Sequence, residues 1–398
     1  MRETQILHRF LEKSVPEMHS KRRKALVDCV EPILKGSILS VTEVGRNLKG
    51  APKTKHNIKR VDRLLSNKHL HAESQNLYKA ITQYLCGSNP NPIILVDWSD
   101  LVQCDRVLVI RAAISLKGRA VTLYEKAYPL EKYNKPVTHR HFLKTLKAQL
   151  PEGCTPTIVT DAGFRGPWFR DVEKHGWHWI GRIRNCICFS SSDKDNWAPT
   201  KSLHKRANAI PKYVGHCRLS KKKPYECHLY LYKKKKVGRK SHRTAHAFRR
   251  HAKESVFRKQ QKEPWIIATN LPPTRFDAAD IIRIYGKRME IEECFRDLKS
   301  HRSGFGYNFC LSKKIDRINV LLLMAALATV CLWWVGIAVE KKAWQYHFQA
   351  NTHKARRVFS TLFIAREVLK HSGYIVPYRE LLTSFQELPS LIERMNEC

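Results

Sequence analysis

The segment 320–339 constrains the fold more than any other part of the chain. Its twenty residues contain a single polar side chain, that of Thr329. A helix of that length is long enough to cross the hydrocarbon layer of a membrane. A helix that is apolar on all sides can instead lie at the centre of a soluble core, surrounded by other elements. The sequence favours a central helix and leaves a membrane-anchored protein as the alternative.

The charge of the chain points to a polyanionic partner. Among 398 residues, 73 are Lys or Arg and 35 are Asp or Glu, so the formal net charge is +38. Such a charge opposes compaction unless a polyanion compensates it, and nucleic acid is the commonest such partner. With 43% hydrophobic residues the chain is not a disordered tail. Twelve cysteines are too few for a disulfide scaffold, and the first residues lack a secretory signal, so we expect a cytoplasmic protein.

Residues 1–88 show apolar positions at three- and four-residue steps, which predicts an all-helical N-terminal domain. A short helix is expected from Ser40, and a second one at 54–65. The second helix combines an apolar stripe with four basic side chains, those of His56, Lys59, Arg60 and Arg63. This pattern is typical of a helix that packs on one side and contacts DNA on the other. A solvated basic face without a ligand gives the same pattern.

A turn-rich break at 86–92 separates this region from one that alternates strands and helices. Strands are predicted at 93–97, 107–116, 121–128, 157–161, 177–184 and 265–269, and helices at 139–150, 168–175 and 278–299. This order predicts an α/β sheet whose first three strands form a meander.

Residues 185–263 form a strongly basic insertion between these strands. From Arg218 to Lys262 there are 17 Lys or Arg and two acids. A strand-like run at 225–232 predicts β structure at its start and an irregular chain after Lys233. Several cysteines gather in the insertion without the spacing of a structural zinc site, so zinc binding is the weaker interpretation. They are Cys186, Cys188, Cys217 and Cys227, the last followed by His228.

Two predicted strands end in a carboxylate, Asp97 in one and Asp161 in the other. Burying both is costly unless a cation lies between them, and a divalent metal is the usual one. An Asp that only caps the following turn is the simpler alternative.

The helix predicted at 278–299 supplies a third acid. At about 100° per residue, one stripe about 60° wide contains four polar side chains, those of Tyr285, Arg288, Glu292 and Lys299. The adjoining face is apolar and is expected to pack. Acids that hold metals beside cations that hold phosphates are what a metal-dependent phosphodiester site requires. An exposed helix with ordinary i,i+4 ion pairs is the alternative.

At this point the chain resembles a known family. The segments Val-Asp-Trp-Ser-Asp around Asp97 and Thr-Asp-Ala-Gly-Phe around Asp161 look like those of the cut-and-paste insertion-sequence transposases of the DDE class. So does the spacing Tyr-(2)-Arg-(3)-Glu-(6)-Lys that begins at Tyr285. The likeness also includes 54–60 and 348–352, so it extends over nearly the whole chain.

The resemblance implies an α/β fold built on a ribonuclease-H-like catalytic core with a β-rich insertion. The implied divisions are a helical DNA-binding domain at 1–88, the core at 89–184 and 264–345, the insertion at 185–263, and a helical C-terminal region at 346–398 that serves dimerisation.

The resemblance also implies roles for the site residues. Asp97, Asp161 and Glu292 would bind two Mg²⁺ ions, for which Mn²⁺ can substitute. Tyr285, Arg288 and Lys299 would contact DNA phosphates near the cleaved end. Trp265 lies where a related transposase stacks a flipped base, although a core tryptophan on a strand would look the same.

The implied reaction begins with water nicking the transposon end. The freed 3′-OH then forms a hairpin across the duplex, the hairpin is opened, and the 3′-OH attacks target DNA. The implied partners are the double-stranded DNA of the terminal inverted repeats and of the target, and a second copy of the chain in a synaptic dimer. No membrane is expected, and the location would be the nucleoid in the bacterial cytoplasm. A non-enzymatic basic DNA-binding protein is the alternative function.

Overall fold

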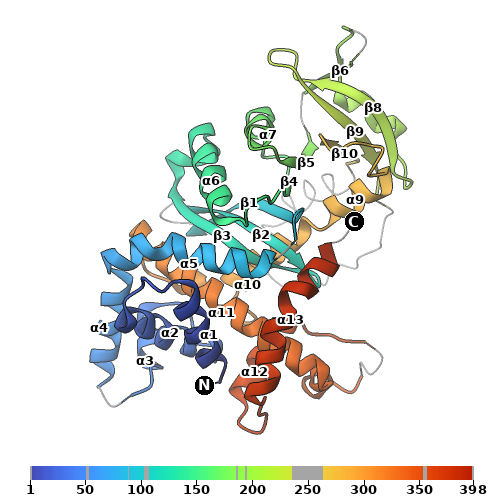
Figure 1. Ribbon diagram of the computed structural model, residues 1–398. Coiled ribbons are helices and arrows are strands. Elements are labelled where there is room, and N and C mark those ends of the chain that lie inside the picture. Colours follow the sequence, from blue (N-terminus) through green and yellow to red (C-terminus); the bar gives the residue numbers. More distant parts are fainter. Residues whose placement is uncertain are drawn as a thin grey trace, which may run out of the picture. The chain divides into compact units, whose positions relative to one another are not determined.

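The computed structural model describes residues 2–50, 53–87, 89–102, 107–184, 187–192, 195–234, 263–352 and 356–396. The chain forms two compact units. The first unit joins Met1–Cys154 to Met289–Glu397, and the second unit is Thr155–Arg288. Their helices and strands are labelled in Figure 1.

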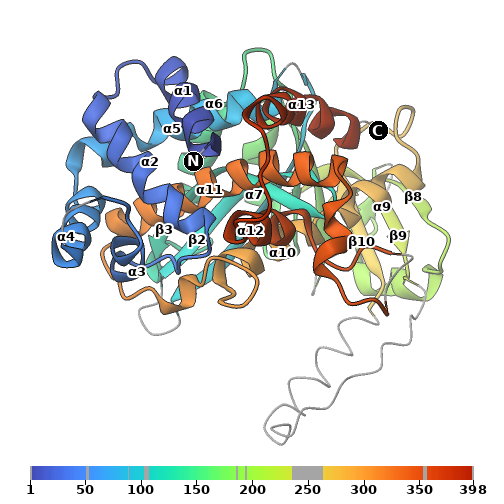
Figure 2. The same cartoon turned by 90° about the horizontal axis from the view of Figure 1, so that it is seen from below.

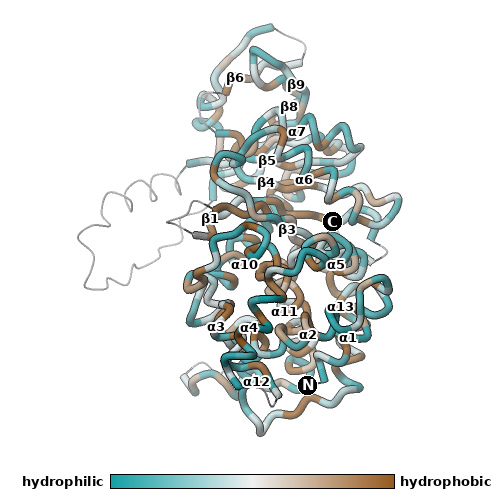
Figure 3. Tube along the Cα trace, turned by 90° about the vertical axis from the view of Figure 1, so that its left-hand side faces the viewer, coloured by the Kyte–Doolittle hydropathy of each residue, from teal (hydrophilic) through white to brown (hydrophobic). Residues whose placement is uncertain are grey.

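The first unit is built around the apolar segment found in the sequence. Helix α11 (Ile315–Lys341) contains it, and every residue of 320–339 is buried. Helices α1, α2, α5, α12 and α13 and strand β3 pack against α11. Figure 2 shows α11 running among these helices, and Figure 3 shows its hydrophobic colouring. The helix is apolar and long enough to cross a membrane, but its apolar window lies inside the protein, which is consistent with a soluble core.

Five helices precede the first strand, which confirms the helical prediction for this region. They are α1 (Arg2–Ser14), α2 (Ser20–Leu34), α3 (Val41–Arg46), α4 (Thr54–Leu65) and α5 (Lys68–Cys86). Ser40 begins α3 as expected, because its hydroxyl accepts a hydrogen bond from the amide of Glu43 at 3.2 Å. Helices α3 and α4 pack closely at Gly45, where a Cβ would lie 2.6 Å from the Cα of Ile58.

The predicted meander is present in the first unit. Strands β1 (Ile93–Val102), β2 (Val107–Leu116) and β3 (Arg119–Pro129) pair antiparallel in the order β3-β2-β1. Every residue of β2 is buried. The 3₁₀ turn η1 (Leu130–Lys132) and helix α6 (Pro136–Gln149) follow. One expectation was wrong: β1 does not end at Asp97 but continues to Val102, because its polar second half still pairs with β2.

The rest of the first unit is mainly helical. It consists of α10 (Met289–Lys299), η4 (Tyr307–Phe309), α11, η5 (Trp344–Phe348), α12 (Thr361–Lys370) and α13 (Tyr378–Asn396). Helix α13 reaches the sheet, where the side-chain amide of Asn396 donates to the carbonyl of Ser115 at 3.0 Å.

The second unit is a mixed sheet with helices. Its strands are β4 (Thr157–Thr160), β5 (His178–Ile183), β6 (Cys188–Ser191), β7 (Ala198–Pro199), β8 (Lys212–Leu219), β9 (Tyr225–Tyr232) and β10 (Trp265–Thr269), in the order β4-β5-β10-β9-β8-β6-β7. Strands β4 and β5 are parallel, and the later pairs are antiparallel. Helices α7 (Gly166–Glu173) and α9 (Ala278–Gly286) and the 3₁₀ helix η2 (Thr200–Arg206) complete the unit. The insertion is therefore β-rich at its start, as predicted, whereas its lysine-rich part at 235–262 lies outside the described residues.

The prediction of a single helix at 278–299 is wrong. It is two helices, α9 and α10, separated by a turn at Lys287 and Arg288. At the break, the amides of Lys287 and Arg288 donate to the carbonyls of Ile284 and Tyr285, three residues earlier. These tighter bonds follow Gly286, which has a low helix propensity.

Candidate active site

Asp97 lies in a row of charged side chains that crosses the three strands of the first unit. It is directly opposite Arg111 on β2, and Arg111 is directly opposite Glu125 on β3. Side chains directly opposite each other in an antiparallel pair share one face of the sheet. Asp97 is half-buried, and its Oδ1 accepts a hydrogen bond from the amide of Trp98 at 2.8 Å.

Helix α10 covers the face of the sheet that carries this row. The Nη1 of Arg111 donates to the sulfur of Cys294 at 3.1 Å, and its guanidinium lies 4.5 Å from the centre of the Phe295 ring. Since Asp97 shares a face with Arg111, Asp97 is on the side of the sheet that α10 occupies.

Glu292 lies on the edge of α10 nearest β1. Lys299 marks this edge, because its ammonium donates to the hydroxyl of Ser99 on β1 at 2.8 Å. Glu292 precedes Lys299 by two turns and lies within about 20° of it around the helix. Ser99 is two residues beyond Asp97 and therefore shares its face of β1. The structure thus brings Asp97, Glu292 and Lys299 to one face of the first unit.

The surroundings of Lys299 disfavour its positive charge and would favour the binding of an anion. Burial lowers the pKa of Lys299, and Arg111 lowers it further, while Asp100 opposes the shift. A phosphate placed beside the ammonium would restore the charge that burial disfavours.

The second unit holds the other predicted site residues. Asp161 directly follows the fully buried strand β4, as predicted, and its Oδ1 accepts from the amide of Gly163 at 2.8 Å. Tyr285 is buried on α9, and burial raises the pKa of its phenol. Arg288 and Arg182 oppose that rise, and Asp161 adds to it, so these three charged groups lie around the phenol.

The four residues of the Tyr-Arg-Glu-Lys spacing therefore do not share one helical stripe. Tyr285 is on α9, Arg288 is in the turn, and Glu292 and Lys299 are on α10. The apolar face expected beside them is divided in the same way: Ile284 is buried on α9, and Ile291, Phe295 and Leu298 are buried on α10.

Trp265 stands beside Tyr285 in the second unit. It is half-buried on β10, with its ring 5.0 Å from that of Tyr285 and 5.6 Å from that of Tyr232, both edge-on. This position fits a stacking platform and also fits a strand tryptophan that packs between two tyrosines.

Arg182 lies beside Tyr285 and was not among the residues predicted from the sequence. It lies on β5, and its guanidinium is 3.6 Å from the carboxylate of Glu263, which also pairs with Arg184 at 2.9 Å. Burial lowers the pKa of Arg182, and the nearby Tyr285 opposes this. An arginine inside the largely apolar run that starts at Trp177 was the signal that could have found it.

The predicted metal ligands are all carboxylates. Oxygen ligands of this kind are those that Mg²⁺ and Mn²⁺ prefer, so the donor set fits the expected ions. Within the part of the chain that the structure describes, no cluster of three or more His, Cys, Asp or Glu side chains is close enough to hold a metal. Of the three predicted ligands, Asp97 and Glu292 belong to the first unit, and Asp161 belongs to the second.

The basic face predicted on α4 is exposed. His56, Lys59, Arg60 and Arg63 are all exposed, whereas Val61, Leu64 and Leu65 are buried. Arg317 at the start of α11 holds α4 in place, because its guanidinium pairs with Asp62 at 2.7 Å and donates to the hydroxyl of Ser66 at 2.6 Å. The basic face is thus presented by a helix that is fixed to the core.

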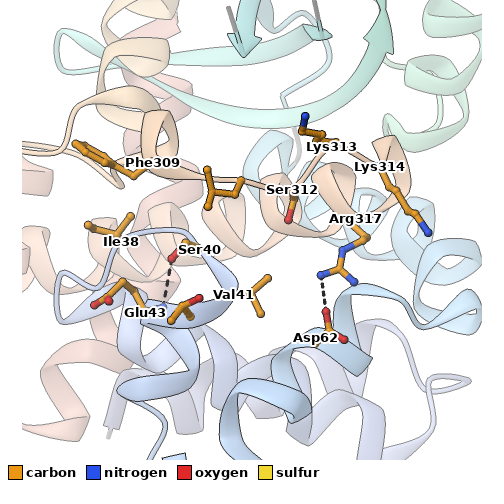
Figure 4. A pocket seen from close by; sticks show the side chains of 12 residues that line it. Ile38, Ser40, Val41, Glu43, Asp62, Phe309, Ser312, Lys313, Lys314 and Arg317 are labelled. Atoms are coloured by element: carbon orange, nitrogen blue, oxygen red, sulfur yellow. Dashed lines mark hydrogen bonds and ion pairs between the residues drawn. The ribbon is translucent and has the colours of Figure 1, made fainter. Parts of the chain in front are cut away.

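A pocket of about 680 Å³ lies between this helical region and the chain before α11. Figure 4 shows its wall of Val41 and Glu43 from α3, and of Ser312, Lys313 and Arg317 from the other side, with the Arg317–Asp62 pair across it. Leu311, also in the wall, is 91% exposed. None of the predicted catalytic residues lines this pocket.

The cysteines of the insertion give no support to zinc. Cys188, Cys217 and Cys227 are free thiols, and Cys186 lies outside the described residues. Burial raises the pKa of both Cys217 and Cys227, which disfavours the thiolate that zinc requires.

A comparison with protein families identifies the class. Residues 131–331 match the family described as the transposase DDE domain, and this segment is just over half of the chain. The protein belongs to the DDE transposase family. No curated protein matches the chain. The matched segment contains Asp161 and Glu292 and begins after Asp97. Family membership makes the protein a metal-dependent enzyme that cuts and joins DNA.

Proposed function

We propose that this transposase binds the terminal inverted repeats of its insertion sequence, cleaves them through hairpin formation, and joins the 3′-OH ends to target DNA. The observation that carries the proposal is the bond between Lys299 and Ser99, because it sets the Glu292 edge of α10 against the strand of Asp97. Within the family we propose kinship with the transposase of the bacterial composite tetracycline-resistance transposon, on the spacing that begins at Tyr285.

Asp97, Asp161 and Glu292 would hold the divalent ions, Mg²⁺ or Mn²⁺. When bound, two such ions activate an attacking oxygen and stabilise a leaving one in phosphodiester chemistry. The ligand residues are held by the fold: Asp97 by the amide of Trp98 and Asp161 by the amide of Gly163.

The cations of the site would position the DNA. Lys299, on the same edge of α10 as Glu292, would contact a phosphate of the cleaved strand. In the second unit, Arg288 and the phenol of Tyr285 would contact phosphates near the end, and Trp265 would stack an unpaired base during hairpin formation. The exposed basic face of α4 would recognise the repeat, with His56, Lys59, Arg60 and Arg63 meeting phosphates or base edges. A homodimer would bring two ends together on the nucleoid.

The test is cleavage of a supercoiled plasmid that carries matched inverted repeats, with Mg²⁺, Mn²⁺ or chelator. We expect Asp97→Ala, Asp161→Ala and Glu292→Ala each to abolish cleavage and to leave binding of the ends intact. Glu293→Ala is the matched control, because this acid lies about 100° around the same helix from Glu292 and pairs with Arg119 and Arg296. This variant should retain cleavage. A variant that still cuts would remove its residue from the triad. Wild-type protein that binds the ends but never cuts would favour the non-enzymatic alternative.

A further inference from the structure

A buried ion pair lies next to Asp97, and the reaction described above does not use it. The Nε and Nη2 of Arg111 donate to Oε2 of Glu125 at 2.9 and 2.6 Å. Only 3% of the Arg111 side chain and 1% of the Glu125 side chain are exposed. The other carboxylate oxygen of Glu125 accepts from the hydroxyl of Tyr78 at 3.5 Å.

Stability alone does not explain this pair. Taking two charges out of water costs several kcal/mol each, and packed apolar side chains of similar volume often serve equally well. Burial opposes the charge of Arg111, but the attraction of Glu125 outweighs it and raises the pKa of the guanidinium. Arg111 is therefore a permanent cation in the interior, and its effect on neighbouring groups depends on Glu125.

The neighbour that matters is Asp97. In the β1–β2 pairing it is directly opposite Arg111, on the flank away from Glu125. The Cβ atoms of such a pair are about 5 Å apart, within reach of a guanidinium. In the structure all three guanidinium nitrogens are directed elsewhere, two to Glu125 and Nη1 to Cys294 on α10.

We propose that Glu125 is a positioning residue of the metal site: it draws the guanidinium of Arg111 away from Asp97 and neutralises its charge. The proposal rests on the assignment of Asp97 as a metal ligand. Without Glu125, Arg111 would turn its uncompensated charge toward Asp97 and compete with the metal for its carboxylate.

The experiment measures Mn²⁺ binding to the full-length protein without DNA, from the electron paramagnetic resonance signal of free Mn²⁺, well below the melting temperature. We expect Glu125→Gln to weaken Mn²⁺ binding by about 10- to 100-fold, the range seen when the groups that support metal ligands are changed. The double variant Arg111→Met/Glu125→Met removes both charges and should recover most of this loss, because the cation directly opposite Asp97 is gone.

One control variant separates the effect of charge from that of a lost hydrogen bond. Tyr78→Phe removes the hydroxyl that donates to Glu125 and keeps both charges, so its Mn²⁺ affinity should stay within about twofold of wild type.

If Glu125→Gln lowers only the melting temperature and leaves Mn²⁺ affinity unchanged, the pair is structural and the proposal is wrong. It is equally wrong if the folded double variant binds Mn²⁺ as weakly as Glu125→Gln. If Asp97→Ala binds Mn²⁺ as wild type does, the assignment of Asp97 as a metal ligand fails instead.

Discussion

Gly45 provides a direct test of how the N-terminal helices present their basic face. It lies on α3 where α4 crosses, and a Cβ built there would be 2.6 Å from the Cα of Ile58 and 2.9 Å from its Cγ1. Ordinary packing needs a separation of at least about 3.4 Å, so Gly45→Ala must separate the two helices by nearly 1 Å. Overpacking of this kind costs about 1 to 3 kcal/mol.

For a unit of this size such a cost lowers the melting temperature by about 2 to 12 °C. The variant should also bind DNA ends more weakly, because the basic side chains of α4 shift relative to α3 without any change of charge. Calorimetry and a gel-shift titration with a terminal-repeat duplex measure the two effects.

Gly373→Ala is the matched control, because a Cβ at Gly373 meets nothing within 4 Å. Adding Ile58→Ala to Gly45→Ala should rescue the protein only in part, since that change removes the clash with the side chain of Ile58 but leaves the clash with its backbone. Wild-type melting and end binding in Gly45→Ala would refute the reasoning about helix packing.

Three further predictions concern the proposed DNA contacts. The pKa of Lys299 is below the ordinary lysine value of 10.5, so its charge is present at low pH and is lost before that of an exposed lysine as pH rises. As pH rises, cleavage should therefore decline before pH 10.5 is reached, and Lys299→Arg should shift this decline to higher pH or remove it. Identical pH profiles of cleavage for the wild type and Lys299→Arg would contradict this role of Lys299. Lys59→Ala should reduce the slope of log binding constant against log salt by about 1, and an unchanged slope would remove Lys59 from the interface. Trp265→Ala should bind ends and nick them but form few hairpins, because about 1 to 3 kcal/mol of base-stacking free energy is lost. An unchanged ratio of hairpin to nicked product would make Trp265 a packing residue.

Helices and strands could be predicted well from the sequence wherever the pattern of apolar residues was sufficient to define them. The strands at 107–116, 225–232 and 265–269 and the helix at 54–65 have the predicted bounds. In these segments the apolar pattern is dense and the ends are marked by turn or charged residues, so local sequence and tertiary packing agree.

The helix at 278–299 could not be predicted correctly from periodicity. The apolar residues on both sides of the break, such as Ile284 and Ile291, are buried, so the pattern continues through the turn without a sign of interruption. The break depends on two i→i+3 hydrogen bonds after Gly286, and hydropathy does not report backbone geometry. The extension of β1 past Asp97 was not predicted for a related reason. Its residues are paired with β2 through the backbone, whereas their side chains are polar and partly exposed and give no strand-like apolar pattern.

The candidate site shows the same difference between what the sequence reveals and what strand pairing adds. Asp97, Asp161 and Glu292 stand out in the sequence because carboxylates at such positions need a partner. Arg111 is visible in the sequence as one arginine within a largely apolar strand, but that pattern does not show what lies opposite it. Only the register shows that it lies between Asp97 and Glu125, beneath α10.

The Tyr-Arg-Glu-Lys spacing has a structural meaning that one helix would not give it. The chain passes from the second unit to the first between Arg288 and Met289, so Tyr285 and Arg288 belong to one unit and Glu292 and Lys299 to the other. A continuous helix would fix the four side chains by its own geometry. With the turn between them, Tyr285 is held by its ring contact with Trp265 in one unit, and Lys299 by its hydrogen bond to Ser99 in the other. The spacing therefore sets the length of the connection between the two units at this point. We expect the insertion of one residue at the turn to reduce plasmid cleavage far more than a substitution there, and equal cleavage by the two variants would contradict this.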